Sequence, residues 1–432
     1  MSDYMFMLES HLSSDQMRVV TLVQGAAVEA NVSVFLTGGA MRDMMGAFPI
    51  RDLDFTLEGP ALKLAKTVAQ RGGAEVISTD DNRKVAHLRF PGGVSAELSM
   101  ARHERYPKPG GKPQVTPATI HEYLRGRDFT INAIGLSLNR ASRGLVIDPT
   151  NGISDLERRQ LRAVGNYSLY DEPVRLLRML RLKVRLGFTV DERTEMQYRN
   201  AREAGMEKHI PARGLSEELR AIAEEANPGE VVRVLEEENL LWLFSPALAG
   251  PKLNLAGFQK LVKVRQLLPF GVDLHIDHLA LFLNLLGENL TPKEKAALAG
   301  NVMMDKRELL DWQKLEAKSK KLESEVKSPK LHRPSKIYNI LAKAPGEQLL
   351  LLLLRSQQRL VQDRIRNYLQ KYVLTAQEVT DAEVAAKGAK PDTPKFEKLK
   401  QEMIAARLDA RPKKPAAEPM EPPPAPAHAA RR

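Results

Sequence analysis

Two aspartates in residues 51–55, Arg-Asp-Leu-Asp-Phe, have a spacing that suits metal-dependent chemistry. In an extended strand alternate side chains point to the same face, so Asp52 and Asp54 would share one face. Leu53 and Phe55 would point into a core. The two carboxylates would lie roughly 6.6 Å apart along the strand. Such a pair can hold two metal ions about 3.5–4 Å apart, as nucleotidyl transfer requires.

A glycine pair comes before this strand. Residues 32–36 predict a buried strand, and residues 40–45 predict a helix. Between them, Gly38 and Gly39 predict a tight turn where the backbone can approach a phosphate at the helix N-terminus. Asp-x-Asp and Gly-Gly each occur by chance in many loops. A site that binds both phosphate and metal requires the strand, the turn, the helix and the paired carboxylates together, however. Their combination therefore favours a nucleoside triphosphate site.

Four arginines follow a helical spacing between residues 174 and 185. They recur at intervals of three, three and four, at Arg175, Arg178, Arg181 and Arg185. They would therefore lie on one side of a helix whose other side is apolar. A charge stripe is usually a solvated face. With no acids among them, these arginines repel one another unless an anion lies nearby, and a triphosphate or an RNA backbone would fit.

The composition suits a polyanionic partner without proving one. A net charge of +11 over 432 residues favours RNA, because lysines and arginines supply most non-specific RNA affinity. The absence of cysteine excludes disulfides and thiolate metal sites, whereas a magnesium site needs only oxygen ligands. The N-terminus lacks the pattern of a signal peptide, and the leucine run 349–354 is too short to span a bilayer. We expect a cytoplasmic protein without membrane contact and infer no obligate protein partner.

The pattern changes near residue 150. Before it, a helix at 61–70 and strands near 75–78, 85–90 and 94–100 alternate; after residue 153 the apolar spacing is helical. We predict helices at 215–225, 231–243, 257–267, 278–286, 292–299, 306–324, 336–341, 347–373 and 394–408. Residues 106–113 form a basic loop rich in proline and glycine, which we expect at the surface or over the nucleotide.

Several motifs resemble those of the tRNA nucleotidyltransferase and bacterial poly(A) polymerase family, the class II CCA-adding enzymes of the polymerase-beta-like superfamily. Residues 38–54 resemble its metal and triphosphate motif, and residues 127–133, Arg-Asp-Phe-Thr-Ile-Asn-Ala, resemble its second motif. Residues 171–178 stand where the family carries its base-reading carboxylate and arginine, and residues 388–409 are similar to a C-terminal element of many members. The resemblance covers nearly the whole chain to about residue 410.

The resemblance implies an α+β protein. A polymerase-beta-like nucleotidyltransferase head, a mixed sheet with helices, would be followed by an all-α neck, body and tail. We place the head at residues 1–150, the RNA- and nucleotide-binding neck at 151–225, and the RNA-binding body and tail at 226–410. Residues 411–432, rich in proline and charge, are predicted to be disordered.

The resemblance also implies roles for individual residues. Asp52 and Asp54 would hold Mg²⁺, with Glu97 as a third ligand. Glu97 lies on the polar face of the predicted strand 94–100, where a solvated surface glutamate is the alternative interpretation. Nucleotide-binding residues would be Gly38, Gly39 and Arg42 at the triphosphate, Arg127, Asp128 and Asn132 near the sugar and the junction of head and neck, and Arg178.

Glu172 and Arg175 are the predicted substitute for a template base. At positions i and i+3 of a helix start they can present a carboxylate acceptor beside a guanidinium donor, which suits adenine or cytosine. The family usually has Glu then Asp at this point, whereas this chain has Asp171 then Glu172. The reversal leaves the use of CTP open while ATP is expected. A salt bridge that caps the helix is the alternative role.

The sequence therefore predicts a template-independent enzyme that adds AMP, with CMP left open, from nucleoside triphosphates to the 3′ end of tRNA. CCA, CC-only and A-only addition all remain open. Poly(A) polymerase activity on general RNA shares every motif quoted above. An inactive RNA-binding relative is a third interpretation, and the intact Asp52 and Asp54 weigh against it.

Overall fold

The computed structural model describes residues 3–248, 250–269, 274–391 and 393–410. The predicted disordered tail, residues 411–432, lies outside the described residues. The chain divides into two compact units. The first takes in the residues up to Gln259 and His278–Trp312; the second takes in Lys260–Asp277 and the residues from Gln313 on. Predicted boundaries at residues 150 and 225 fall within the first unit, and the head, neck and body remain a proposed division.

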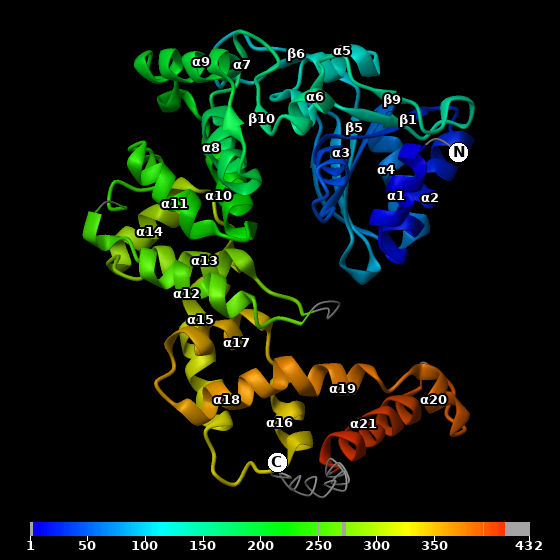
Figure 1. The fold of residues 1–432 in the computed structure, drawn as a ribbon, viewed down its shortest axis with the longest axis vertical. Helices are drawn as coiled ribbons and strands as arrows, with labels where there is room; N and C mark the ends of the chain where they lie inside the picture. Colours follow the sequence, from blue (N-terminus) through cyan, green and yellow to red (C-terminus); the bar gives the residue numbers. More distant parts are fainter. Residues whose placement is uncertain (1–2, 249, 270–273, 392, 411–432) are drawn as a thin grey trace, which may run out of the picture. The chain divides into compact units, whose positions relative to one another are not determined.

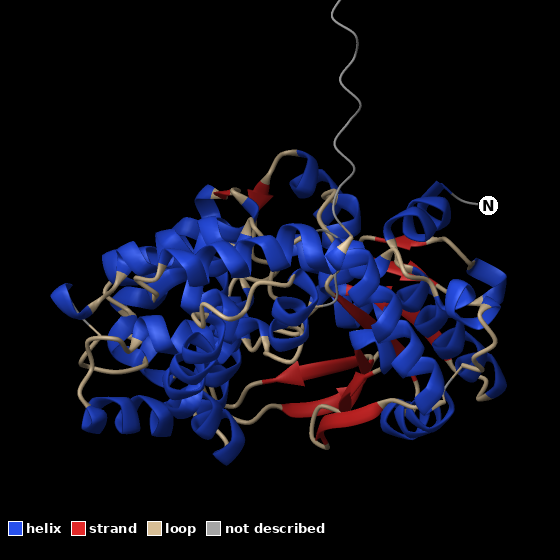
Figure 2. Ribbon diagram, turned by 90° about the horizontal axis from the view of Figure 1, so that it is seen from below, coloured by secondary structure: helices blue, strands red, loops and turns tan. Residues whose placement is uncertain are grey.

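A seven-stranded mixed sheet forms the centre of the head (Figures 1 and 2). Its order is β3-β4-β5-β2-β1-β8-β9, and β2 pairs in parallel with β5 while the other neighbours are antiparallel. The strands are β1 (Ser33–Thr37), β2 (Asp52–Glu58), β3 (Glu75–Asp80), β4 (Val85–Arg89), β5 (Ser95–Met100), β8 (Gly135–Ser137) and β9 (Val146–Ile147).

Alternation along β2 positions the aspartates as predicted. Leu53, Phe55 and Leu57 are fully buried, whereas Asp52 is exposed and Asp54 is partly exposed. Burial of these three apolar side chains fixes the register of β2, because a shift by one residue would put them on the other face. Helices α2 (Ser14–Glu29) and α4 (Ala61–Gly72) pack on each other and on the sheet. Helix α3 (Gly38–Met45) follows β1 directly.

Short elements join the sheet to the helices that follow. They are the hairpin β6 (Arg102–Arg105) and β7 (Gln114–Pro117), α5 (Ile120–Arg125), the 3₁₀ turn η2 (Thr130–Asn132), α6 (Gly152–Glu157), and a parallel pair β10 (Gln160–Leu161) and β11 (Thr189–Val190). The helices of the first unit that follow are α7 (Ser168–Asp171), α8 (Val174–Leu186), α9 (Glu192–Glu203), α10 (Ala212–Glu224), α11 (Pro228–Glu237), α13 (His278–Leu286) and α14 (Pro292–Asn301). Helix α8 packs against α10 and α11, and its apolar residues are buried there.

The second unit is helical in its described residues. Two helices, α12 (Leu255–Arg265) and α15 (Lys306–Val326), run from one unit into the other. The others are α16 (Pro334–Leu341), α17 (Gly346–Arg355), α18 (Arg359–Asn367), α19 (Val373–Gln377), α20 (Asp381–Ala386) and α21 (Pro394–Asp409). A head of mixed sheet and helices followed by mostly helical elements confirms the predicted fold class, but the all-α prediction for residues 151–225 was wrong, because the short parallel pair β10–β11 lies there. No helix in the described ranges is long and apolar enough to cross a bilayer.

Two predicted helices extended too far along the chain. Residues 347–373 were expected to form a single helix, but α17 ends at Arg355 and α18 begins only at Arg359. Ser356 adopts an extended conformation, and its hydroxyl accepts the backbone N–H of Gln358 at 3.1 Å. Serine side chains compete with the helix for backbone partners in this way. The predicted helix 231–243 also stops early, at Glu237 in α11, before a separate 3₁₀ turn.

Gly152 at the start of α6 provides a test of how tightly the connecting elements pack. A Cβ at this position would lie 2.1 Å from the carbonyl oxygen of Thr130. We expect Gly152→Ala to lower the free energy of unfolding by about 1–3 kcal/mol, the usual cost of overpacking. Gly165→Ala is the matched control, because nothing lies within 4 Å of the added methyl. Equal shifts of the melting temperature in the two variants, relative to the wild type, would contradict the close contact.

Candidate active site

One cavity of about 580 Å³ brings the predicted residues together. Its walls come from α3, β2, β5, α8, α10 and the residues around η2. The predicted residues that line it are Gly39, Arg42, Asp52, Glu97, Arg127, Asp128, Asn132, Glu172, Arg175 and Arg178. Gly38 and Asp54 are not in the lining, but both lie directly beside Gly39. Residues from four separate sequence segments therefore form one site.

The glycine turn and the carboxylate strand are joined by a hydrogen bond. The backbone N–H of Gly39 donates to Oδ2 of Asp54 at 2.9 Å. Gly38 has φ +65°, and a Cβ there would lie 2.9 Å from the same oxygen. Both the backbone angle and the space therefore require glycine at this position. The turn is shorter than predicted, because α3 already begins at Gly38.

Three carboxylates lie next to one another at this end of the cavity. Asp54 on β2 is the register partner of Glu97 on β5, and Asp52 precedes it on the same strand face. Burial raises the pKa of Asp54 to about 7, and repulsion from Glu97 and Asp52 adds to this effect. Loss of solvent around its carboxylate also raises the pKa of Asp52, although the residue as a whole is exposed. Carboxylates that repel one another in this way are stabilised by a divalent cation.

These carboxylates do not form a closed metal cage. In the described part of the chain no three His, Cys, Asp or Glu side chains are placed to hold a metal ion on their own. Mg²⁺ is commonly bound by one or two carboxylates together with substrate phosphates, so an open set of this kind fits a site completed by a nucleotide. Glu97 is partly exposed, and its Oε2 lies 3.8 Å from Nδ1 of His87.

Arg42 is held rigidly beside the glycine turn. Its Nε donates to Oδ1 of Asp43 and its Nη1 donates to Oδ1 of Asn132, both at 2.8 Å. Asn132 in turn donates from Nδ2 to Oδ1 of Asp128 at 3.1 Å. The first and second predicted motifs are therefore connected side chain to side chain, although 90 residues separate Arg42 from Asn132 in the sequence.

Arg127 and Asp128 form the buried floor of the cavity. Arg127 donates from Nη1 to the hydroxyl of Tyr123 at 2.8 Å and lies over the ring of that tyrosine, 5.5 Å from its centroid. Its Nε is buried and has no hydrogen-bond partner among the described residues. Burial opposes ionisation of Asp128, but Arg178, Arg127 and Arg175 outweigh it and hold the pKa of Asp128 well below its ordinary value.

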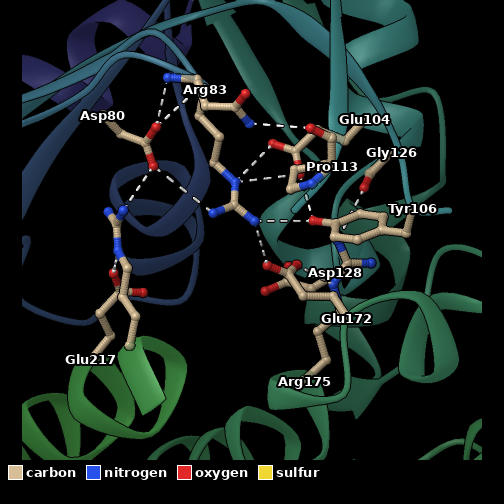
Figure 3. A network of polar contacts seen from close by, with 12 residues as sticks. Asp80, Arg83, Glu104, Tyr106, Pro113, Gly126, Asp128, Glu172, Arg175 and Glu217 are labelled. Atoms are coloured by element: carbon tan, nitrogen blue, oxygen red, sulfur yellow. Dashed lines mark hydrogen bonds and ion pairs between the residues drawn. The ribbon is translucent and has the colours of Figure 1, made fainter. Parts of the chain in front are cut away.

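Glu172 and Arg175 meet as predicted (Figure 3). Nε of Arg175 donates to Oε2 of Glu172 at 2.9 Å. Arg175 also donates to Oγ of Ser168 at 2.6 Å and to backbone carbonyl oxygens of residues 126 and 127. The predicted salt bridge therefore exists, but no side-chain bond to the helix backbone accompanies it, because the start of α8 has no side-chain cap.

Arg83, which no sequence motif indicated, lies in the turn between β3 and β4. Its Nη2 donates to Oε1 of Glu172 and to the hydroxyl of Tyr106, both at 3.2 Å, and its Nε donates to Glu104 at 3.3 Å (Figure 3). Both oxygens of Glu172 are thus bonded, one to Arg83 and one to Arg175. No local pattern signals this contact, because Arg83 and Glu172 are 89 residues apart in the sequence.

The arginine stripe on α8 is not a solvated face, and that interpretation was wrong. The carboxylates come from other elements. Arg178 bonds to Asp128 at 3.0 Å, and both Arg178 and Arg181 bond to Glu218 on α10, at 2.8 and 2.9 Å. Arg181 also reaches Glu225 at 3.0 Å. Glu218 and Glu225 are seven residues apart, so they lie on one side of α10 and its end, facing the stripe.

The basic loop 106–113 contacts the end of α7 and the turn between β3 and β4. The N–H of Gly110 donates to the carbonyl oxygen of Asp171 at 3.1 Å, and the carbonyl oxygen of Pro113 accepts a bond from Asn82 at 3.1 Å. The loop therefore contacts the residue immediately before Glu172.

Comparisons with known proteins agree with this geometry. Residues 34–162 match the model of the poly A polymerase head domain. The chain is 30% identical over 346 residues to an A-adding tRNA nucleotidyltransferase of Aquifex aeolicus, covering 78% of this chain and 40% of that protein. It is 35% identical over 202 residues to a CC-adding tRNA nucleotidyltransferase of Deinococcus radiodurans, covering 46% of this chain and 52% of that protein. The chain thus spans about half or less of the length of these curated relatives.

A solved structure shows the same similarity. It is a tRNA nucleotidyltransferase in complex with a primer tRNA and an incoming ATP analog. The similarity covers 83% of this chain and all of that chain, with 27% sequence identity and a TM-score of 0.52. It therefore extends beyond the residues matched by the family model.

The raised pKa of Asp54 predicts a pH dependence of stability in metal-free buffer. The pKa is about 7 in the folded protein and ordinarily 3.8, so between these values the folded state keeps a proton that the unfolded chain releases. The stabilisation that this proton gives to the folded state is complete below about pH 4 and is lost as the pH rises through 7. We expect Asp54→Asn to melt ~2–4 °C or more above the wild type at pH 8.

That difference should shrink steadily as the pH is lowered from 7 toward 4. Glu75→Gln is the control, because Glu75 is an exposed residue of β3 in the same sheet. Melting curves of wild type and Asp54→Asn that stay parallel across this pH range would contradict the raised pKa.

Proposed function

The chain belongs to the tRNA nucleotidyltransferase family, and from its site we propose that it transfers nucleoside monophosphates from nucleoside triphosphates to the 3′ end of tRNA. The observation that carries the proposal is the hydrogen bond between Gly39 and Asp54. It joins a turn that can bind phosphate to a strand that can bind metal. Attack by the RNA 3′-hydroxyl on the α-phosphate would release pyrophosphate without a template strand.

Members of this family work with a divalent cation, and we propose Mg²⁺ for this chain. Asp52 and Asp54 would hold it, with Glu97 as a further ligand. When bound, the metal lowers the pKa of the attacking hydroxyl and neutralises charge on the leaving pyrophosphate. Gly38, Gly39 and Arg42 would hold the triphosphate through backbone N–H groups and a guanidinium. The bonds from Arg42 to Asp43 and Asn132 orient that guanidinium before the nucleotide arrives.

Glu172 would read the base. Each carboxylate oxygen has two lone pairs, so the bonds from Arg83 and Arg175 leave room for one more donor at each oxygen. An exocyclic amine of adenine or cytosine can donate there, whereas the carbonyl oxygens of uracil and guanine cannot. Arg127, Asp128, Asn132 and Arg178 would support the sugar side of the same cavity. Adenine is the expected base, and cytosine stays open because Asp171 and Glu172 reverse the usual order.

The relatives support tRNA as the RNA substrate. Both curated relatives are named tRNA nucleotidyltransferases, and the solved relative holds a primer tRNA and an ATP analog. The net charge of +11 fits an RNA partner. A cytoplasmic location and the absence of a required protein partner remain predictions. General poly(A) addition is the second candidate, because the matched family model describes a poly A polymerase head.

One extension experiment separates these functions. The purified protein is incubated with tRNA transcripts that lack the whole CCA end or only the terminal adenosine, and with an unrelated RNA, with each nucleotide supplied singly. Extension of tRNA alone, with ATP or CTP, supports the proposal and distinguishes A, CC and CCA addition. Long adenylate tails on the unrelated RNA would favour poly(A) polymerase activity. No extension of any RNA would favour an inactive relative.

Asp52→Asn and Asp54→Asn should each reduce extension by at least about 1,000-fold, because the carboxylates serve the metal. Binding of tRNA should stay within about threefold of wild type, since neither side chain belongs to the core. Glu75→Gln serves as the control at the edge of the same sheet. Retention of a sizeable fraction of wild-type extension by either aspartate variant, with magnesium present, would rule out the assignment.

Glu172→Gln should weaken base selection. The amide keeps an acceptor but adds a donor, so uracil and guanine carbonyls gain a partner. We expect the preference for ATP over UTP and GTP to fall by about 10-fold or more, the usual effect of one base contact. Asp171→Asn is the control, because Asp171 is exposed and makes no side-chain hydrogen bond to the described residues. Equal loss of selectivity in both variants would move the base-reading role away from Glu172.

A further inference from the structure

Arg185 is bonded differently from the other arginines of the α8 stripe. Arg175 uses Nε and both terminal nitrogens in hydrogen bonds, and Arg178 and Arg181 each bond to two carboxylates at 3.0 Å or less. Arg185 makes one hydrogen bond, from Nη2 to Oδ2 of Asp43 at 2.7 Å, and a looser ion pair from Nε to Glu225 at 3.9 Å. Most of its N–H donors therefore have no partner within the described chain.

The carboxylates near Arg185 are already shared. Asp43 bonds to Arg42 through its other oxygen, Oδ1. Glu225 also bonds to Arg181 at 3.0 Å and to Arg51 at 3.3 Å. The guanidiniums of Arg42, Arg51 and Arg185 thus depend on two acids that have other partners. All three line the cavity that contains Gly39 and Asp52.

The electrostatics of the stripe support this distinction. Burial opposes the charge of Arg178 and Arg181, but Glu218 outweighs it and raises their pKa values. For Arg185, burial lowers the pKa to about 10, and the neighbouring charges of Arg42 and Arg51 add to the effect. A guanidinium in this position is charged at neutral pH but is incompletely compensated by its neighbours. An anion beside it would compensate the remaining positive charge.

The position of Arg185 indicates which anion. Arg51 directly precedes Asp52 in the sequence, and Arg51 and Arg185 both pair with Glu225, at 3.3 and 3.9 Å, so both lie at the metal end of the cavity. Glu224 also faces this end, and burial together with the charge of Asp52 raises its pKa. The side chain of Arg185 is only 13% exposed, which suits a small anion inside the cavity better than an RNA backbone on the surface.

We propose that Arg185 and Arg51, together with Arg42, bind the β- and γ-phosphate oxygens of the nucleoside triphosphate, which leave as pyrophosphate. The inference rests on the proposed function and extends it to residues outside the recognised motifs. Arg185 comes from α8, and Arg51 immediately precedes β2. Two guanidiniums that are 134 positions apart in sequence (185 − 51) and share Glu225 would therefore hold the phosphate end of the nucleotide.

The test uses inorganic tripolyphosphate with Mg²⁺ as the probe, measured by calorimetry on the full chain. Charge-assisted hydrogen bonds contribute strongly to binding affinity. Arg185→Gln and Arg51→Gln should therefore each weaken tripolyphosphate binding by about 10-fold or more. Arg185→Lys should have an intermediate affinity, because lysine keeps the positive charge but lacks the paired N–H donors of the planar guanidinium. The KM for ATP should rise by a similar factor while the affinity for tRNA and the choice of base stay unchanged.

Arg220→Gln is the matched control. Arg220 lies on α10, is ion-paired with Glu308 at 2.6 Å, and does not line the cavity. We expect its tripolyphosphate affinity to stay within about twofold of wild type. Normal tripolyphosphate binding by Arg185→Gln would overturn the proposal. So would a loss confined to tRNA affinity, which would assign Arg185 to the RNA backbone.

The remaining outcomes are equally decisive. If Arg185→Lys binds as poorly as Arg185→Gln while Arg51→Gln binds normally, Arg185 only positions Asp43 and the proposal fails. Wild-type protein that binds tripolyphosphate in this Arg185-dependent way but extends no RNA would uphold this inference and overturn the proposed function. If the wild-type protein extends tRNA and Arg185→Gln binds tripolyphosphate normally, the proposed function stands and this inference fails.

Discussion

The need to compensate buried charge determines how the sheet and the helices that follow it meet. A guanidinium inside a protein must be paired, because its desolvation costs several kcal/mol. Four arginines of α8 point away from the apolar side of their helix, and they pair with Glu172 and with carboxylates from α3, α10 and the segment at Asp128. The ion pairs hold α8 against the sheet domain, so the residues proposed to read the base keep a fixed position relative to the metal-binding strand.

Much of the fold followed from periodicity. The predicted alternation in β2 was correct, and α13 begins and ends at the predicted residues, His278 and Leu286. Local patterns succeeded there because the apolar residues themselves decide which face is buried. They failed at Ser356, where a single side-chain hydrogen bond ends a helix whose leucine-rich pattern would otherwise continue. The sequence pattern carries no sign of that local competition.

The site was predictable only in part. Motifs identified Gly39, Asp54 and Arg42, because spacing within one strand and one turn fixes their geometry. Arg83 and Glu218 could not be found in this way. Arg83 reaches Glu172 from a turn that has no motif, and Glu218 neutralises a stripe that looked solvated when α8 was considered alone. Contacts of this kind depend on which helix packs against which, and a single sequence does not encode that in any local spacing.

The two ends of the cavity differ in how fully their polar groups are bonded, and this difference is consistent with two different tasks. At the base end, both oxygens of Glu172 and the nitrogens of Arg175 are held by neighbours, so few arrangements of acceptors and donors are available. A rigid group of this kind can discriminate between bases, because a mismatched base leaves a polar group unpaired. At the proposed phosphate end, Arg185 makes one hydrogen bond to the described residues, and burial raises the pKa of Asp54 to about 7, so this region has polar groups available for ligands. Binding of metal and triphosphate would complete the bonding at that end while the base end needs little rearrangement.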